Sequence, residues 1–243
     1  MRELWQGLQQ ELAGLALPSS CAGCGLPRVR GELCARCRGA FAGVRPSRVR
    51  PWPVPPGLPR VYAAVPYAGA ARQVLLAHKE RGALRLAGPL GGLLASAVRE
   101  ARVHVRRPAG KREGEEQWPL TLVPVPSARL AVAGRGHDPV RRVALAAARE
   151  LRRAGLPARV LAVLRQRRTV ADQAGLTAQQ RAVNLSGALE LVPGSGKLLA
   201  GGETLLVDDV MTTGASLAEA ARALAEGARR VSAAAVVAFR SKS

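Results

Sequence analysis

The sequence is poor in aromatic and in acidic residues. It holds seven aromatic residues among 243, and its 17 acidic residues face 37 basic ones, for a formal net charge of +20. Few aromatic side chains leave little material for stacking nucleobases, whereas the charge excess favours a polyanionic partner. Only four of the basic residues are lysines, and Ala, Gly, Leu and Val are abundant. This composition is also typical of a GC-rich genome, so charge alone leaves a nucleic-acid partner open.

Long hydrophobic runs are missing as well. No segment approaches the roughly 18 apolar residues that a membrane-spanning helix requires. The first 21 residues carry Glu3 and Glu11 and lack a continuous apolar stretch, so they do not resemble a signal peptide. We therefore expect a cytoplasmic protein without a membrane span. The length suits a medium domain joined to a small one.

The residue pattern divides the chain into three parts. Residues 1–44 combine a helix expected over 3–16 with all four cysteines, residues 45–60 form a linker rich in Pro and Arg, and residues 61–243 alternate strands with helices. The strands expected are 61–67, 120–125, 159–164, 204–209 and 230–239, and the helices are 69–77, 83–103, 138–154, 177–185 and 215–226. Such alternation predicts an α/β fold with a five-stranded, mostly parallel sheet flanked by helices. Ligands of open α/β sheets bind at the carboxyl ends of the strands. The charged stretch 104–117 is expected to be a surface loop.

The four cysteines form two CxxC pairs separated by nine residues. The pairs are Cys21 with Cys24 and Cys34 with Cys37. Two CxxC turns can present four thiolates to one tetrahedral Zn²⁺, which would be structural because no coordination position stays open. The alternatives are a disulfide pair or unused thiols, and a cytoplasmic location disfavours the disulfide.

The sharpest functional pattern is TLLVDDVMTTGASL at 204–217, in which an apolar strand ends in Asp208 and Asp209. A loop of small residues then precedes a helix, and the loop is Thr212, Thr213, Gly214, Ala215 and Ser216. Loop amides at a helix N-terminus can wrap a phosphate. The acids would repel a phosphate but suit a diol, so the pattern indicates a ribose 5-phosphate ligand. The alternative is an ordinary strand–turn–helix in which an acid caps the helix. No GK[ST] follows the glycine, which excludes a Walker-type loop.

Several motifs follow the order of a known family. The segment VDDVMTTGAS resembles the signature with which type I phosphoribosyltransferases bind phosphoribosyl pyrophosphate (PRPP), and the whole chain resembles the ComF/ComFC competence-protein family. The other motifs that carry the resemblance are CAGC…CARC, AHKERG (77–82), VPVP (123–126), RGHD (135–138) and QAGLTAQQRAVN (173–184). The resemblance implies a type I phosphoribosyltransferase-like sheet behind a small zinc-knuckle module. RGHDP departs from the family's RGFNQ-type pattern, because Asp138 brings an acid to a loop expected to meet an anion.

The resemblance also implies roles for single residues. The loop Thr212–Ser216 would hold the 5-phosphate, and Asp208 and Asp209, as the catalytic pair, would hold the ribose hydroxyls and help to orient Mg²⁺. The candidates for contact with pyrophosphate or another anion are Ser127, Ala128, Arg129, Arg135 and Lys79. The three cations among them are equally interpretable as solvated surface residues. His78, beside Lys79, is expected at the surface or as a cap, and His137 is expected to be structural rather than a proton shuttle.

Three functions remain open from the sequence. The family resemblance implies a PRPP-binding protein of natural competence, which handles incoming single-stranded DNA and works with a helicase partner. A metabolic phosphoribosyltransferase of nucleotide salvage needs a base pocket, for which residues 61–243 offer only Tyr62, Tyr67 and Phe239. A non-catalytic PRPP sensor is the third. A basic strip supports DNA contact or is a solvated face, and it comprises Arg141, Arg142, Arg149, Arg152, Arg153, Arg159, Arg165, Arg167 and Arg168.

Overall fold

The structure of the protein is a computed structural model that describes residues 20–105, 119–127, 132–134, 136–168, 180, 184–227 and 229–241. The helix expected over 3–16 lies outside these residues. Most of the charged stretch 104–117 and most of the helix expected over 177–185 also lie outside them.

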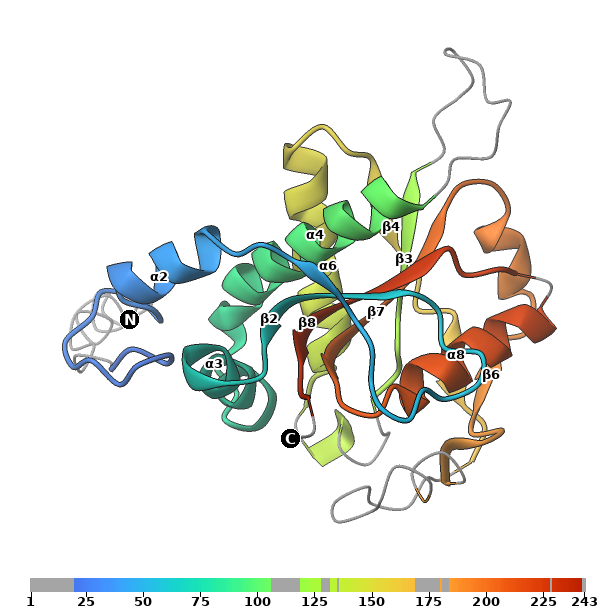
Figure 1. Cartoon of the computed structure of the whole chain (residues 1–243), viewed down its shortest axis with the longest axis horizontal. Coiled ribbons are helices and arrows are strands. Elements are labelled where there is room, and N and C mark those ends of the chain that lie inside the picture. The colour runs from blue at the N-terminus through green and yellow to red at the C-terminus, as the bar shows by residue number, and fades with distance from the viewer. Residues whose placement is uncertain are drawn as a thin grey trace, which may run out of the picture.

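A six-stranded sheet forms the centre of the molecule (Figure 1). Its strands, in spatial order, are β1 (Ser47–Val49), β2 (Val61–Pro66), β8 (Ala233–Phe239), β7 (Thr204–Met211), β3 (Leu120–Pro124) and β4 (Ala158–Val160). All neighbouring pairs are parallel except β1 with β2, which is antiparallel. The α/β class and the mostly parallel sheet expected from the sequence are therefore confirmed.

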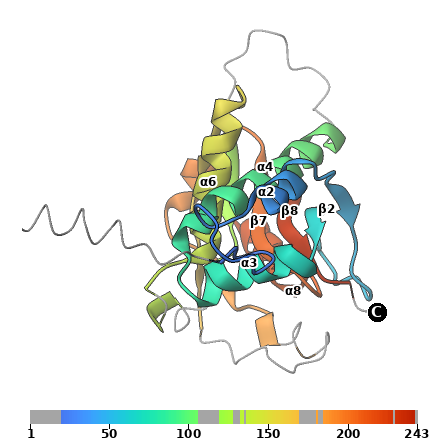
Figure 2. The same cartoon turned by 90° about the vertical axis from the view of Figure 1, so that its left-hand side faces the viewer.

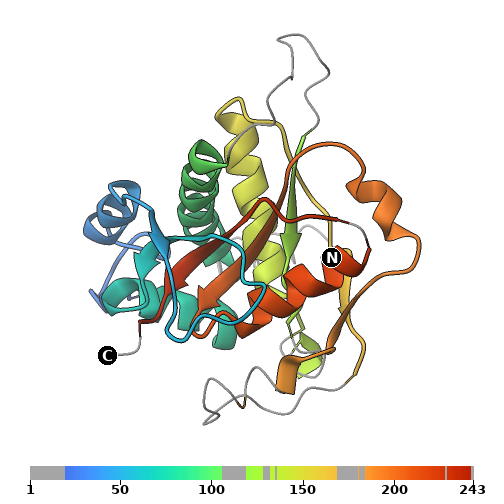
Figure 3. The same ribbon diagram turned by 45° about the vertical axis from the view of Figure 1, so that its right-hand side comes forward.

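Helices cover both faces of this sheet, as a parallel sheet requires. On one face lie α3 (Gly69–Glu80), α4 (Ala87–His104) and α6 (Pro139–Arg153), and on the other lies α8 (Ala215–Glu226) (Figures 1 and 3). The central strand β7 serves both layers. Leu205 and Val207 pack in the core under α4 and α6, whereas Leu206 packs in the core under α8. Because both faces of β7 are buried, successive residues of this strand are apolar on both sides.

Helices α4 and α6 meet at a glycine. A Cβ added at Gly91 of α4 would lie 2.5 Å from the Cβ of Ala146 and 2.8 Å from the backbone nitrogen of Ala147. The exposed face of α6 is arginine-rich, while its other face buries Val140, Val143 and Leu151. The close approach of the two helices makes this layer of the core compact.

Two features depart from the expected element list. The sixth strand, β1, comes from the Pro/Arg-rich segment, so part of the expected linker belongs to the sheet. The strand expected over 159–164 is split into β4 and β5 (Leu164–Gln166), and β5 pairs with β6 (Leu189–Leu191) in a separate antiparallel hairpin. A single apolar run in the sequence thus contributes strands to two sheets, and periodicity alone does not show where the run divides.

Three short helices complete the described elements. They are the 3₁₀ helices η1 (Leu84–Leu86) and η2 (Ser195–Leu199) and the α-helix α2 (Ala35–Ala42).

The cysteine module packs on the first face of the sheet. Figure 2 shows its chain and α2, in blue, against α3 and α4. Gly23 lies against α3, because a Cβ there would come within 3.3 Å of the Cβ of Ala70. Leu33 and Cys37 belong to the same buried cluster as Leu90 and Leu94 of α4. The module therefore shares the core of the sheet domain.

Candidate functional site

The two adjacent acids lie at the carboxyl end of β7, in the middle of the sheet. The backbone N–H of Asp209 donates to Oδ1 of Asp208 at 2.8 Å, and the N–H of Val210 donates to Oδ1 of Asp209 at 2.7 Å. These bonds fix both carboxylates within the last four residues of the strand. The expected strand end at Asp209 is extended by two residues, to Met211.

Asp209 is buried and forms an ion pair with Lys79. The Nζ of Lys79 lies 2.9 Å from Oδ2 of Asp209, across 130 residues of sequence. Lys79 stands in the last turn of α3, so packing of that helix on the sheet brings the cation to the end of β7. Lys79, a candidate anion contact, thus lies at the acid pair, where its charge offsets that of Asp209.

Asp208 lies in a different environment. Burial and the neighbouring charge of Asp209 raise the pKa of the Asp208 carboxyl well above its ordinary value, although Lys79 acts in the opposite sense. A cation or a hydroxyl donor beside such a carboxyl group would stabilise its ionised form. The pair therefore has the electrostatic character of a site for a polyol or a metal-bound ligand.

The loop that follows β7 leads directly into α8. Gly214 is the N-cap, with a φ of +77°, a left-handed conformation that glycine adopts without strain. Thr213 and Ala215 are buried, while Thr212 and Ser216 are partly exposed. A side chain at Gly214 would meet Leu58, whose Cδ2 would lie 3.0 Å from the added Cβ. The structure thus places the small-residue loop at a helix N-terminus, the arrangement that suits an anion.

Of the five residues expected at pyrophosphate or another anion, the structure describes two. Lys79 is at the acid pair, as described above, and Ser127 follows β3, the neighbour of β7. The N–H of Val125 donates to the carbonyl of Val207 at 2.9 Å, so the chain reaches Ser127 at the edge of the sheet where Asp208 lies. Ala128, Arg129 and Arg135 lie outside the described residues.

A histidine pair lies beside Lys79. The expectation that His78 is a surface or capping residue is wrong, because His78 is 2% exposed. Its ring meets that of His137 edge-on at 5.9 Å between centroids, and Nε2 of His137 lies 3.3 Å from the carbonyl oxygen of His78. Burial, reinforced by His137, lowers the pKa of His78 to about 4. His78 is therefore neutral at physiological pH and is a buried packing residue. It follows Ala71, Val74 and Leu75 at the helical spacing of the inward face of α3, the sequence signal that could have predicted its burial.

The four cysteines come together in one cluster. Their sulfur atoms all lie within 4.8 Å of one another, and none is in a disulfide. The Sγ atoms of Cys24 and Cys34 are 3.7 Å apart, which matches the spacing of about 3.8 Å between two thiolates bound tetrahedrally at about 2.3 Å from Zn²⁺. Backbone amides point at the sulfurs: the N–H of Cys34 lies 3.3 Å from Sγ of Cys21. The cluster can hold a metal ion such as zinc.

Electrostatics of the cluster agree with this geometry. Burial and the other three sulfurs raise the pKa of Cys37 to about 12. Burial also opposes ionisation of Cys21, but hydrogen bonds from backbone amides, led by that of Cys34, lower its pKa to about 6. Four thiols this close cannot all ionise unless a cation lies among them. A bound divalent cation would offset the repulsion between the four thiolates.

The basic strip is only partly available to a ligand. Several of its arginines have structural partners: Arg152 donates to the carbonyl of Ala158, Arg159 to that of Leu198, and Arg165 to Glu190. Arg142 and Arg149 are exposed on α6 and form no ion pair within the described part of the chain. Some arginines of the strip are thus bonded within the protein, and others are exposed to a possible ligand.

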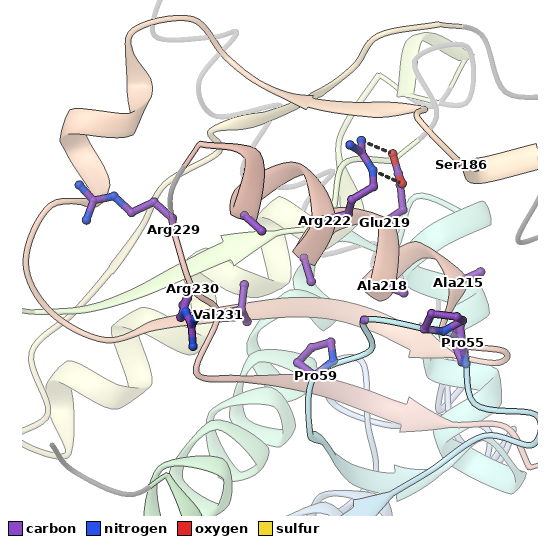
Figure 4. Close-up of a pocket in the computed structure, with 14 residues that line it drawn as sticks. Pro55, Pro59, Ser186, Ala215, Ala218, Glu219, Arg222, Arg229, Arg230 and Val231 are labelled. Atoms are coloured by element: carbon purple, nitrogen blue, oxygen red, sulfur yellow. Dashed lines mark hydrogen bonds and ion pairs between the residues drawn. The ribbon is translucent and has the colours of Figure 1, made fainter.

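A cavity in the described part of the chain lies beside the loop after β7 and not over the acid pair. It has a volume of about 880 Å³ and runs along the outer face of α8, between that helix and the turn 55–59 (Figure 4). Ala215 and Ala218 line its floor, and Arg222, held by Glu219 at 2.8 Å, lies at its side. Because Ala215 also belongs to the loop after β7, the cavity adjoins the candidate phosphate site without containing its acids.

No protein-family model matches this chain, and no curated protein matches it. None of the helices in the described residues combines the length and the apolar composition that a bilayer crossing needs.

Proposed function

We propose that the chain binds PRPP at the carboxyl end of β7. The observation that carries the proposal is the junction of an acid pair with a small-residue loop at a helix N-terminus, all within residues 208–216. The loop amides and the dipole of α8 favour a phosphate. The carboxylates, which would repel that phosphate, suit the vicinal hydroxyls of a ribose. A ribose 5-phosphate unit spans both features, and PRPP contains this unit.

The acid pair also supports the Mg²⁺ that accompanies pyrophosphate. Carboxylate oxygens are the ligands that Mg²⁺ accepts in proteins, usually together with phosphate oxygens of the substrate. The raised pKa of Asp208 fits such a role, because a nearby cation would relieve its repulsion from Asp209. When bound, Mg²⁺ would neutralise charge on the pyrophosphate group. Asp208 and Asp209 would hold it or the ribose hydroxyls, and Lys79 would balance the remaining charge.

The proposed reaction type is phosphoribosyl transfer, in which pyrophosphate leaves C1 of the ribose. Positioning and charge stabilisation supply most of the rate enhancement that such a transfer needs. Ser127 lies at the same edge of the sheet as the acid pair and would contact the leaving pyrophosphate. Ala128, Arg129 and Arg135, which lie outside the described residues, remain proposed contacts of the same anion.

We further propose that the four cysteines bind a structural Zn²⁺. Sulfur spacing, amide bonds to sulfur and the opposed pKa shifts of Cys21 and Cys37 support this assignment. A four-thiolate ion has no open position and takes no part in transfer.

The biological role we propose is in natural competence, where the protein would handle incoming single-stranded DNA, with a helicase as a possible partner. The resemblance of the motifs to the ComF/ComFC family motivates this role, and the net charge of +20 supports it. Exposed arginines that form no ion pair with the residues the structure describes, such as Arg142 and Arg149, would contact DNA phosphates, and that contact would weaken steeply with salt.

Calorimetric titration with Mg²⁺-PRPP tests the site. The wild-type chain should show saturable binding, and the double variant Asp208→Asn/Asp209→Asn should lose it, with an affinity reduced at least about 100-fold if two charged contacts of about 1.5–3 kcal/mol each disappear. The matched control is Glu150→Gln/Glu226→Gln, which makes the same charge change at exposed positions in α6 and α8 and should bind normally. Absence of wild-type binding at millimolar PRPP would overturn the proposal.

A further inference from the structure

An exposed tryptophan lies next to the proposed phosphate loop. Trp52 is 87% exposed, more than any other large hydrophobic residue in the described part of the chain. It belongs to the Pro/Arg-rich segment 45–60, which the sequence marks as a linker. The aromatic residues considered for a base pocket lie elsewhere: Tyr62 is buried and stacked on His104, and Tyr67 and Phe239 pack against the core.

The segment around Trp52 is anchored at both ends. Upstream, β1 pairs with β2, and Val49 packs against the core under α8. Downstream, Leu58 packs against the same core. Between them, Pro51 lies 3.4 Å from the position that a Cβ at Gly214 would occupy, and Leu58 lies 3.0 Å from it. The chain on either side of Trp52 therefore packs against Gly214, the N-cap of α8 in the loop that would hold the phosphate.

The turn that follows stays beside this junction. Figure 4 shows Pro55 next to Ala215 and Ala218, at the start of α8. The N–H of Leu58 closes the turn by donating to the carbonyl of Pro55 at 3.3 Å. The segment thus forms one wall beside the phosphate loop and is held there by contacts along its length.

Burial alternates along the segment and sorts its side chains into two sets. Val49 is half-buried and Pro51 is buried, whereas Arg48, Arg50 and Trp52 are exposed. In an extended chain residues two apart lie on the same side, and the chain is in a strand up to Val49. Arg48 and Arg50 form no ion pair within the described part of the chain, and residues 44–60 contain no acid. Two cations and one aromatic ring are therefore exposed within five residues of chain.

Two prolines reduce the entropic cost of presenting this ring. Pro51 and Pro53 bracket Trp52, and each proline has its φ fixed by its own ring. A side chain held on a restricted backbone loses less freedom when it binds, so more of the contact energy is retained as affinity. An exposed indole on such a backbone suits a flat apolar ligand. Cations alongside it require that this ligand also carry negative charge, and a single-stranded nucleic acid meets both conditions.

We propose that Trp52, Arg48 and Arg50 form a stacking platform for single-stranded DNA, on which one base lies against the indole and the adjacent phosphates meet the arginines. The inference rests on the proposed function, since it places the DNA strand beside the loop that would hold PRPP. It adds the segment 48–52 to the arginine strip on α6 as a surface for DNA contact.

Binding of a fluorescein-labelled oligothymidylate of about 16 nucleotides to the full-length protein tests the platform. Trp52→Ala should weaken binding about 5- to 150-fold, the range that corresponds to loss of one base–aromatic stack, and Trp52→Phe should restore much of it. Val103→Ala is the matched control, because Val103 is an exposed apolar residue on α4, and it should bind as the wild type does. Unchanged affinity in Trp52→Ala, or no recovery in Trp52→Phe, would overturn the inference.

Two further measurements separate the contributions of stacking and charge. Arg48→Gln/Arg50→Gln should lower the slope of log K against log salt by about 1.4, the value for two lost phosphate contacts on a single strand. Arg85→Gln/Arg99→Gln, which removes two exposed arginines from η1 and α4, should leave that slope unchanged. In a Trp5→Phe/Trp118→Phe background, Trp52 is the sole tryptophan, and its emission should be quenched by the oligonucleotide.

The Mg²⁺-PRPP titration distinguishes failure of this inference from failure of the proposed function. All Trp52 and arginine variants should bind PRPP as the wild type does. A protein that binds PRPP but no oligonucleotide would overturn the platform alone. A protein whose oligonucleotide binding depends on Trp52 but which binds no PRPP would keep the platform and overturn the proposed ligand.

Discussion

Asp208 and Asp209 are neighbours in sequence but differ in their surroundings. Asp209 has Lys79 at 2.9 Å, whereas burial and the charge of Asp209 raise the pKa of Asp208. A carboxyl group whose pKa is higher in the folded than in the unfolded chain binds its proton more tightly when folded. Folding stability from this group is therefore present at low pH and is lost as the pH rises above the unfolded value of about 4.

This linkage gives a prediction for Asp208→Asn. The amide cannot ionise, so the variant should gain stability relative to the wild type as the pH increases from 5 to 8. The measurement is the difference in free energy of unfolding between variant and wild type, from urea titrations at each pH without PRPP. A difference that stays constant or falls with pH would show that Asp208 ionises without penalty in the folded protein.

Helices α4 and α6 are held together by a contact that tolerates no side chain at Gly91. An added Cβ there would come within 2.8 Å of the backbone of α6, which can move only if the helices separate. One position further on, a Cβ at Gly92 would meet nothing within 4 Å. The two glycines share a helix and differ in their neighbours, so they form a matched pair.

Gly91→Ala should therefore destabilise the fold by about 1–3 kcal/mol, the usual cost of overpacking, although alanine favours a helix. Gly92→Ala should stabilise it by up to about 1 kcal/mol, because only the helix propensity changes. Chemical denaturation of both variants measures this contrast. Equal effects of the two substitutions would mean that α4 and α6 separate without cost.

At the scale of the whole molecule, the cysteine module and the sheet domain share one core. Cys21, Leu33, Cys34 and Cys37 belong to the same buried cluster as the inner faces of α3 and α4. Gly23 lies against Ala70, near the start of the helix whose last turn carries Lys79. Loss of order in the module would thus expose part of the core that supports α3.

We predict that the purified protein contains one Zn²⁺ per chain and that a strong chelator destabilises it. Binding at 100 times the dissociation constant adds about 2.7 kcal/mol to folding stability, so removal of a tight ion should cost about 3 kcal/mol or more. Metal analysis and thermal unfolding with and without chelator measure this, and re-added Zn²⁺ should restore the stability. An unfolding temperature that changes neither with the chelator nor with added Zn²⁺ would contradict the assignment.

The sequence by itself determined the features that depend on neighbours along the chain. The apolar run of β7, its acid pair, the small-residue loop and α8 form one continuous segment, and α8 has the bounds expected from the pattern, 215–226. Four of the five strands expected from periodicity match β2, β3, β7 and β8, because each of these apolar runs carries its own signal, whereas the run 159–164 is divided between β4 and β5. The paired CxxC spacing likewise predicted the cluster that the four sulfurs form.

Only the tertiary structure decided which distant residues meet. Packing of α3 brings Lys79 to Asp209, a partner 130 residues away that the sequence around Lys79 does not identify. The sheet recruits β1 from a segment rich in Pro and Arg, because its edge offers backbone partners that no local propensity records. The same pairing sets Pro51 against Gly214 and leaves Trp52 exposed beside the loop. The residue pattern along the chain specifies the single helices and strands. The contacts between them depend on how the faces of these helices and of the sheet pack together.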